Sequence, residues 1–444
     1  MKRIFFYFML IALMFFMVAC SGGTESETNS SINEDGELEG DIVFWHSFTQ
    51  GPRYDYMQDA ADAFMEEHPG VTIEIESFAW PEFYTKWTTG LTSGQVPDVS
   101  TALPSHVVEM IDVDAITPLN DVIDDIGRDR FNEASLLEGT EDGNNYSIPI
   151  YSHAQVMWYR KDLLDEVNLD VPETWDELYE AAVKISESTD AYGLSVPMGA
   201  GDMAATRFLN FYVRSAGETL ITEDGKANLT SPTAIEGINY WVKMYEATSP
   251  SSSVNYDVLD QANLFYQGDT AFDFNSGFHI GGVETNSPDL LDEIDAAPIP
   301  KINANDESNG IETSNIPLVV WENSDHPDIA KAFIESLYET EGYIDFLHSV
   351  PVGMLPALTD ISEEEAYLDN ETIMKFSDAL DVISEEAEEG TAIGMENGPT
   401  IEAGLITSQG IIENMFQEIV VSGVSVEEAA KNAEEELNRI FDLY

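Results

Sequence analysis

The opening of the folded chain constrains its architecture most strongly. Ile42–Trp45 is a short apolar run suited to a buried strand. Apolar residues then recur at helical spacing between residues 57 and 64, and Val71–Ile75 alternates apolar with polar side chains, as a half-buried strand does. A second helix over about 82–93 leads to a third strand at Val96–Val99. This order of strands and helices predicts a doubly wound α/β lobe with a largely parallel sheet.

Polar and aromatic residues follow the strands of this predicted lobe. Ligands of doubly wound sheets bind beyond the carboxyl ends of the strands, and the loops after these strands lie at that edge. Neutral hydrogen-bond formers and two aromatic rings occur in and near the loops. We therefore expect a binding site that includes His46, Ser47, Trp80, Tyr84, Ser105 and His106.

The chain is long enough for a second lobe. Its 444 residues exceed what one hydrophobic core usually organises. Strand-like stretches occur at 146–151 and 155–159, and Asp224-Gly225 predicts a hairpin turn. N-cap and proline signals predict helices that begin near Thr174, Ser231, His326 and Ser425. Apolar patterns place four tryptophans in the core: Trp45, Trp158, Trp175 and Trp241.

The N-terminus predicts export. Lys2 and Arg3 precede an uncharged run to Val18, which spans roughly 22 Å as a helix and is shorter than a ~30 Å hydrocarbon core. Met17–Cys20 resembles a bacterial lipobox, and Cys20 is the only cysteine of the chain. We expect residues 1–19 to be a signal peptide and Cys20 to carry the lipid that tethers the protein to the membrane. An uncleaved N-terminal anchor is the alternative.

Composition narrows the environment and the partners. Residues 20–40 are rich in Ser, Gly, Glu and Asn and predict a flexible linker. The chain has 84 acidic against 18 basic residues, a formal charge of −66. Nucleic acid is therefore excluded as an expected partner, as are anionic membrane surfaces, because both require basic patches. The acid excess favours a halophilic source, where salt screens the self-repulsion.

Motifs for catalysis and metal binding are missing from the sequence. The seven histidines form no His-Glu-x-x-His pair, and there is no Gly-x-Ser-x-Gly elbow and no P-loop. The acidic runs at 363–365 and 385–389 are typical of a solvated helix face in so acidic a chain, although a glycosidase pair is the alternative. We expect no enzyme activity, no metal and no cofactor.

Several motifs, in their order, resemble one protein family. They are Ile42–Ser47, GVTIEI at 70–75, GQVPDV at 94–99, WYRKDLL at 158–164, VPETWDEL at 171–178 and FYQGDTAFDFNSGF at 265–278. The chain resembles the extracellular solute-binding proteins of ABC importers, the group of the maltose- and glycerol-phosphate-binding proteins. The resemblance implies a periplasmic-binding-protein-like fold of type II, in which two doubly wound α/β lobes joined by crossover strands close on a ligand. It places lobe one at 41–149 and 279–338, and lobe two at 150–278 and 339–444.

The resemblance also implies further site residues. Crossover strands line the floor of the cleft in this family, and the position of Phe278 often carries a stacking aromatic, usually Trp. Loops of lobe two and of the later chain add polar groups. The additional candidates are Tyr151, Ser152, His153, Asp202, Asn275, Phe278, His279, Asn315 and Met354.

The few basic residues favour a neutral ligand. Phosphate and carboxylate recognition uses Arg or Lys, and only four bases lie near the predicted loops: Arg53, Lys86, Arg207 and Arg214. We expect a monomer that captures a neutral mono- or oligosaccharide and delivers it to ABC permease subunits. A glycerol-phosphate-type or other polyol binder is the alternative within the family, and a secreted glycan-processing enzyme or a surface adhesin are alternatives from other classes.

Overall fold

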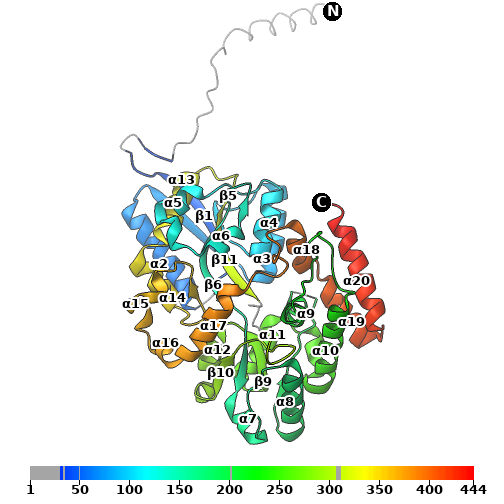
Figure 1. The fold of residues 1–444 in the computed structure, drawn as a ribbon. Helices are drawn as coiled ribbons and strands as arrows, with labels where there is room; N and C mark the ends of the chain where they lie inside the picture. Colours follow the sequence, from blue (N-terminus) through cyan, green and yellow to red (C-terminus); the bar gives the residue numbers. More distant parts are fainter. Residues whose placement is uncertain (1–30, 34–35, 50, 201–202, 307–311) are drawn as a thin grey trace, which may run out of the picture.

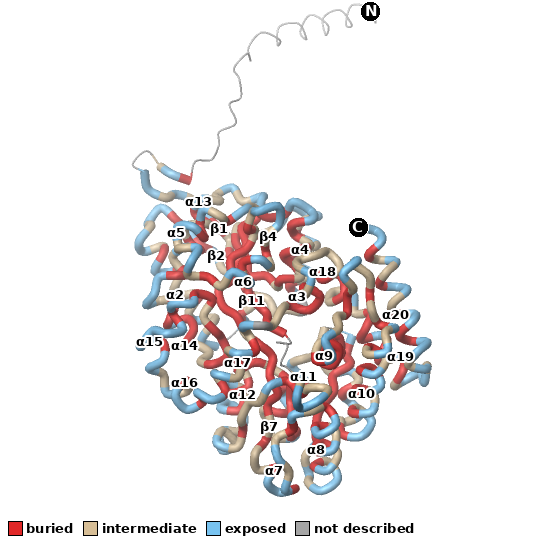
Figure 2. The backbone as a smooth tube through the Cα atoms, viewed as in Figure 1, coloured by how far each residue is buried: buried red, intermediate tan, exposed pale blue. Residues whose placement is uncertain are grey.

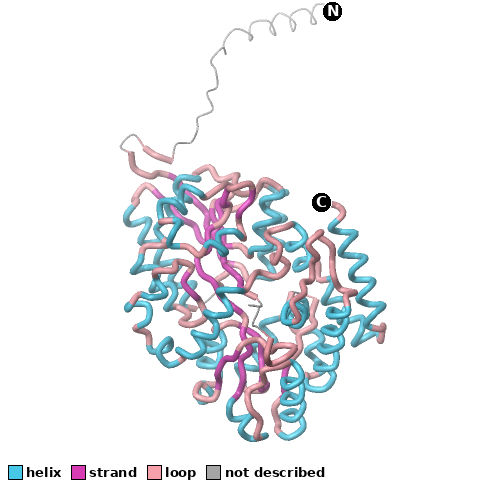
Figure 3. Tube along the Cα trace, in the orientation of Figure 1, coloured by secondary structure: helices cyan, strands magenta, loops and turns pink. Residues whose placement is uncertain are grey.

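The chain forms two α/β lobes, each around its own sheet (Figures 1 and 3). The computed structural model describes residues 31–33, 36–49, 51–200, 203–306 and 312–444. The signal peptide at 1–19 and the lipidation at Cys20 lie outside the described residues and stay predictions. No helix of the described part is long and apolar enough to cross a membrane.

Lobe one contains a six-stranded sheet in the order β12-β6-β11-β3-β1-β2. β1 pairs in parallel with β2 and with β3, and helices α2 and α3 connect these strands, so the predicted strand–helix alternation is confirmed. β11 runs antiparallel between β3 and β6. The elements are β1 (Gly40–His46), α2 (Pro52–Glu67), β2 (Val71–Ser77), α3 (Trp80–Ser93), β3 (Val99–Thr101), β6 (Ile148–Ala154), β11 (Thr313–Val320) and β12 (Leu355–Pro356).

Both faces of this sheet are covered by helices. Because side chains alternate along a strand, Phe44 and Trp45 of β1 enter two different apolar clusters. Phe44 packs with residues of α2, α13 (Pro327–Ser336) and α14 (Thr340–His348), while Trp45 packs with residues of α3 and α4 (Pro104–Asp112). The residues of β3, β6 and β11 are almost all buried, whereas β2 at the edge of the sheet alternates between buried and exposed residues; Figure 2 shows the helices around the sheet as partly exposed. The doubly wound prediction for lobe one is confirmed.

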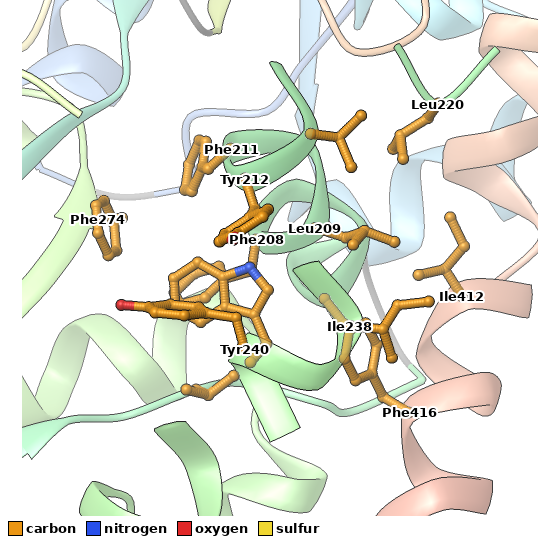
Figure 4. Packing of buried hydrophobic residues seen from close by; sticks show 14 of the residues in the cluster. Phe208, Leu209, Phe211, Tyr212, Leu220, Ile238, Tyr240, Phe274, Ile412 and Phe416 are labelled. Atoms are coloured by element: carbon orange, nitrogen blue, oxygen red, sulfur yellow. The ribbon is translucent and has the colours of Figure 1, made fainter. Parts of the chain in front are cut away.

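Lobe two contains a four-stranded mixed sheet in the order β10-β7-β9-β8. Met157 of β7 faces a large apolar cluster built mainly by α8, α9, α10, α19 and α20, and Trp158 faces the opposite side with α11 and α12. In Figure 4, Phe208 and Tyr240 gather near Phe274 of β9. The elements are β7 (Val156–Arg160), α8 (Trp175–Ser188), β8 (Tyr192–Leu194), α9 (Ala204–Ser215), α10 (Pro232–Thr248), α11 (Val258–Gln267), β9 (Thr270–Asn275), α12 (Phe278–Asn286), β10 (Ile294–Ala297), α19 (Ile411–Ser422) and α20 (Val426–Phe441).

Shorter elements complete the two lobes. They are α5 (Asn120–Ile126), α6 (Glu133–Leu137), the β4–β5 hairpin (Thr140–Glu141 and Asn144–Asn145), α7 (Lys161–Val167), α15 (Glu365–Leu368), α16 (Glu371–Lys375), α17 (Ser377–Glu389) and α18 (Ile401–Ser408). Among them, α17 contacts β6 and β11 of lobe one as well as β7 and β10 of lobe two, so it lies at the junction of the lobes.

The sheets divide the chain differently from the expected lobe boundaries. The first crossing lies at Gln155, between β6 and β7, rather than at residue 150. β10, expected in lobe one, pairs with β7 of lobe two, and β12, expected in lobe two, pairs with β6 of lobe one. The chain therefore returns to lobe one at β11 and leaves it again after α17. β10 and β12 are short and carry no apolar alternation, so neither strand has a local sequence signal.

Local sequence signals are matched by the structure. The Thr174–Glu177 capping box forms, Ser231 caps α10, and Ser425 caps α20. Thr222 and Lys226 close the predicted turn around Gly225. The four tryptophans predicted for the core are all buried: Trp45, Trp158, Trp175 and Trp241.

The predicted linker ends earlier than expected. Ile32 and Leu38 form an isolated bridge, and the Ser31 Oγ lies 3.3 Å from the His326 Nδ1. The described residues 31–33 and 36–40 of the predicted linker therefore belong to lobe one, where Ser31 lies next to the start of α13.

Candidate ligand site between the lobes

One group of predicted residues gathers around Arg53 at the junction of the lobes. The Arg53 guanidinium lies 4.8 Å from the ring centroid of Phe48, from lobe one, and 4.7 Å from that of Phe278, from lobe two. Its Nη1 donates a hydrogen bond to the Tyr151 Oη at 3.1 Å. His153 meets Phe278 edge to face, with ring centroids 6.0 Å apart. We call Phe48, Arg53, Tyr151, His153 and Phe278 the Arg53 cluster.

His46 borders the Arg53 cluster and is held neutral. Its ring stacks on Phe48, and burial together with the Arg53 charge lowers the pKa of His46 to about 4. Its Nδ1 accepts a hydrogen bond from the Phe48 N–H at 3.2 Å, so in the neutral ring the proton is on Nε2. That Nε2 is buried without a partner among the described residues. The Ser47 Oγ is also buried without a hydrogen-bond partner among the described residues.

His153 is also neutral. Burial, with smaller contributions from the Arg207 and Arg53 charges, lowers the pKa of His153 to about 3. Its Nδ1 has no hydrogen-bond partner in the described structure. Neutral imidazoles with unused ring nitrogens can bind sugar hydroxyls.

A second group forms an aromatic wall in lobe one. His106 lies 6.4 Å from Trp80 and 5.4 Å from Tyr84 between ring centroids, and burial lowers the pKa of His106 to about 3. The Tyr84 hydroxyl donates to the Glu109 Oε2 at 2.8 Å. The wall meets α18 of lobe two, because a Cβ built on Gly404 would lie 3.0 Å from the Ser105 carbonyl oxygen.

A third group is already satisfied by internal hydrogen bonds. The Ser152 Oγ donates to the Asn315 Oδ1 at 2.5 Å, and the Asn315 Nδ2 donates to the Glu138 Oε2 at 2.7 Å. Burial raises the pKa of Glu138 to about 7. Ser152 and Asn315 thus tie β6 to β11 and α6, and they offer a ligand less than the sequence suggested.

The remaining candidates do not join these groups. His279 is buried in lobe two, where its Nε2 lies 2.7 Å from the Asp273 Oδ2 and its ring stacks on Phe265. Met354 is fully buried in the apolar cluster of lobe one. Asn275 is half-buried, and its Oδ1 accepts from the Ser276 N–H. Asp202 lies outside the described residues.

Two of the four bases near the predicted site are neutralised in the crossovers. On α9, Arg207 forms a two-oxygen ion pair with Glu312, just before β11, with N–O distances of 2.9–3.0 Å. Arg214 lies on the same face of α9, and its Nε is 3.7 Å from the Glu396 Oε1. Lys86 lies 4.2 Å above the Phe78 ring. Among these bases only Arg53 combines aromatic contacts from both lobes.

Sequence reasoning missed part of this junction. Phe48, Gln155 and Asn210 were not singled out, yet the Gln155 Oε1 and both amide atoms of Asn210 are buried without partners in the described structure. Asn210 lies on α9 between Arg207 and Arg214, on the face that they share. A polar residue inside an otherwise apolar helical pattern was the available signal.

No group of three or more His, Cys, Asp or Glu side chains among the described residues is arranged to hold a metal ion. The site chemistry at the junction is therefore that of aromatic faces, neutral hydrogen-bonding groups and one guanidinium.

Known proteins of similar sequence and structure are solute-binding proteins. Residues 49–344 match the family model described as bacterial extracellular solute-binding protein. The arabinooligosaccharide-binding protein of Halalkalibacterium halodurans is 23% identical over 426 residues, which is 92% of this chain and 92% of that protein. The lactose-binding protein of Rhizobium radiobacter is 23% identical over 70% of this chain and 74% of its own length.

The fold agrees with solved structures. An ABC transporter solute-binding protein of Thermotoga lettingae bound with α-D-tagatose superposes with a TM-score of 0.79 at 21% identity, covering 91% of this chain and all of that chain. Maltose-bound MalE3 of T. maritima gives a TM-score of 0.77 at 19% identity, covering 90% and 99%. The predicted type II periplasmic-binding-protein fold is thereby confirmed. The chain belongs to the family of bacterial extracellular solute-binding proteins.

Proposed function

We propose that this protein captures a carbohydrate, a mono- or oligosaccharide, between its two lobes and delivers it to the permease of an ABC importer. Family membership supports a role in solute capture. The names of its relatives support a sugar, because they bind arabinooligosaccharides and lactose, and the structural neighbours hold tagatose and maltose.

The observation that carries the proposal is the set of unused polar atoms at the junction. The His46 Nε2, the Ser47 Oγ, the His153 Nδ1 and the Asn210 amide are buried without partners in the described residues. Each polar group that is buried without a hydrogen bond costs about 1–3 kcal/mol of folding free energy, so a ligand that pairs with these atoms would remove that cost. The aromatic faces of Phe278 and Trp80 lie in the same junction. Flat apolar faces beside unpaired hydrogen-bonding groups match the C–H faces and hydroxyls of a sugar.

The charges of the crossovers argue against a phosphorylated solute. Arg207 and Arg214 are paired with Glu312 and Glu396, so they are unavailable for a phosphate dianion. The pairing of these two arginines on α9 of lobe two therefore supports a sugar over a glycerol-phosphate-type solute.

We further propose export and lipid anchoring through Cys20, a monomeric state, and binding without turnover. The short apolar N-terminus and the lone cysteine support the first point. Membership in a family of binding proteins supports the last.

A thermal-shift screen tests the proposal. The mature chain is heated in concentrated KCl with a panel of mono- and oligosaccharides, polyols and glycerol phosphate. At least one saccharide should raise the melting temperature, and calorimetry should then give one site per chain. If glycerol phosphate alone stabilises the protein, the alternative is correct. Mass spectrometry should return the bound sugar intact, and cleaved sugar would contradict the non-enzymatic assignment.

A further inference from the structure

Arg53 differs from the other arginines that the structure describes. Each of the others has a carboxylate oxygen within 4.0 Å: Arg128, Arg130, Arg160, Arg207, Arg214 and Arg439. Arg53 has none among the described residues, in a chain where 84 acidic residues face 18 basic ones. Because acids are so abundant, an unpaired guanidinium at the ligand junction is unusual. We therefore ask whether Arg53 binds an acidic group of the ligand.

The geometry of Arg53 leaves one part of it free. Phe48 and Phe278 lie against the guanidinium at 4.8 Å and 4.7 Å from their ring centroids, which directs its N–H groups outward from the edge of the plane. Only the Nη1 donates to a described residue, the Tyr151 hydroxyl. A guanidinium has five N–H donors. The remaining edge is a planar fork, and a fork of this kind matches the two oxygens of a carboxylate.

The groups beside this edge are donors as well. The His46 Nε2 carries the proton of the neutral ring, since its Nδ1 accepts from the Phe48 N–H, and it has no partner in the described structure. The Tyr151 oxygen accepts from Arg53, which leaves its own O–H proton to donate elsewhere, and burial raises the pKa of Tyr151 and keeps it protonated. Arg53, Tyr151 and, through Phe48, His46 thus bring donors to the same part of the junction, and Arg53 has no carboxylate partner among the described residues. A sugar hydroxyl can accept at most two of the hydrogen bonds that these three groups offer, whereas the two oxygens of a carboxylate can accept from all three.

We propose that the sugar captured by this protein carries a carboxylate, as a uronate or another sugar acid does, and that this carboxylate binds the free edge of Arg53 beside His46 and Tyr151. The inference rests on the proposed function and narrows its substrate class, and it replaces the expectation of a wholly neutral ligand. A single guanidinium matches the charge of a carboxylate better than that of a phosphate dianion. The acidic surface does not prevent this binding in salt, because the Debye length falls to ~3 Å at 1 M.

Matched pairs of sugars test the inference by calorimetry in concentrated KCl. The probes are glucose and glucuronate, galactose and galacturonate, and disaccharides that differ only by oxidation of one terminal CH₂OH to a carboxylate. The acidic member of at least one pair should bind about ten- to a hundredfold more tightly, the range expected for hydrogen bonds to a charged group. Arg53→Gln should remove that preference. Arg53→Lys should retain part of it, because Lys keeps the charge without the fork.

The control is Arg439→Gln, which makes the same change of charge at an exposed pair on α20 and should leave the preference intact. Thermal unfolding of each variant verifies that it folds. If the neutral member of every pair binds as well as the acid, the inference is wrong while the proposed function stands. An acid preference that survives in Arg53→Gln also overturns it. If no member of any pair binds, the proposed function fails together with the inference.

Discussion

Removing one partner of the ion pair between Arg207 and Glu312 should strongly destabilise the crossovers. Glu312 is buried and Arg207 is nearly so, with 1% and 12% of their side-chain surface exposed, and the guanidinium contacts both carboxylate oxygens. Arg207→Met removes the cation and leaves Glu312 buried without its partner. Breaking a buried pair in this way costs about 3–5 kcal/mol of unfolding free energy. The double variant Arg207→Met/Glu312→Gln leaves no buried charge and should recover about half of that loss or more.

Urea unfolding at fixed salt measures these two variants and the single variant Glu312→Gln, which together form a double-mutant cycle. A pH series adds a second test. In Arg207→Met the unpaired Glu312 has a folded pKa above its unfolded value, since burial already raises the pKa of Glu312 in the parent. The loss of stability should therefore be complete above the folded pKa and shrink as the pH falls toward the unfolded value near 4.5. A cost below about 1 kcal/mol for the single variant, or additive costs in the cycle, would refute this account of the crossovers.

Four further outcomes are expected. Phe278→Ala and Trp80→Ala should each weaken sugar binding by about 1–3 kcal/mol, because each removes an aromatic face. The control Trp241→Phe should lower the melting temperature more than the affinity. Calorimetry measures the affinities, and unchanged affinity in both alanine variants counts against the site. Titration of His46 should not affect affinity between about pH 5.5 and 8, because its pKa of about 4 keeps the ring neutral there. A titration step near pH 6.5 that disappears in His46→Gln would contradict that state. The melting temperature should rise steeply with added KCl, because salt screens the formal charge of −66, and a flat response speaks against a halophilic adaptation. Cys20→Ser should release the protein from the membrane fraction or leave its precursor uncleaved, and a processed, membrane-bound variant disproves lipidation.

The fold was predictable from sequence where local signals are strong. Three local patterns each predict a single structure: the apolar run of β1 and the alternation of β2 predict strands, and the capping box at Thr174 predicts a helix start. The structure contains all three elements. The lobe boundaries were not predictable in the same way. β10 and β12 are held by pairing with neighbouring strands rather than by their own composition, so their lobe depends on contacts distant in the chain.

The candidate site was predictable in outline and less so in detail. Loop positions at the ends of strands led to His46, and the junction contains it. His279 shows the limit, because its place beside Phe278 in the sequence suggested the cleft, while its hydrogen bond to Asp273 holds it in the core of lobe two. A helix turns neighbouring side chains to different faces, so adjacency in sequence does not fix adjacency in space. The position of Arg53 between two rings depends on both lobes and has no local signature.

A crystal structure of the protein grown with the tightest saccharide from the screen shows whether a sugar binds at the junction of the lobes. We expect one sugar between lobe one and lobe two, within hydrogen-bond distance of the His46 Nε2 and against the ring of Phe278. A sugar bound on the outer surface of either lobe, with the His46 Nε2 still unpaired, would contradict it.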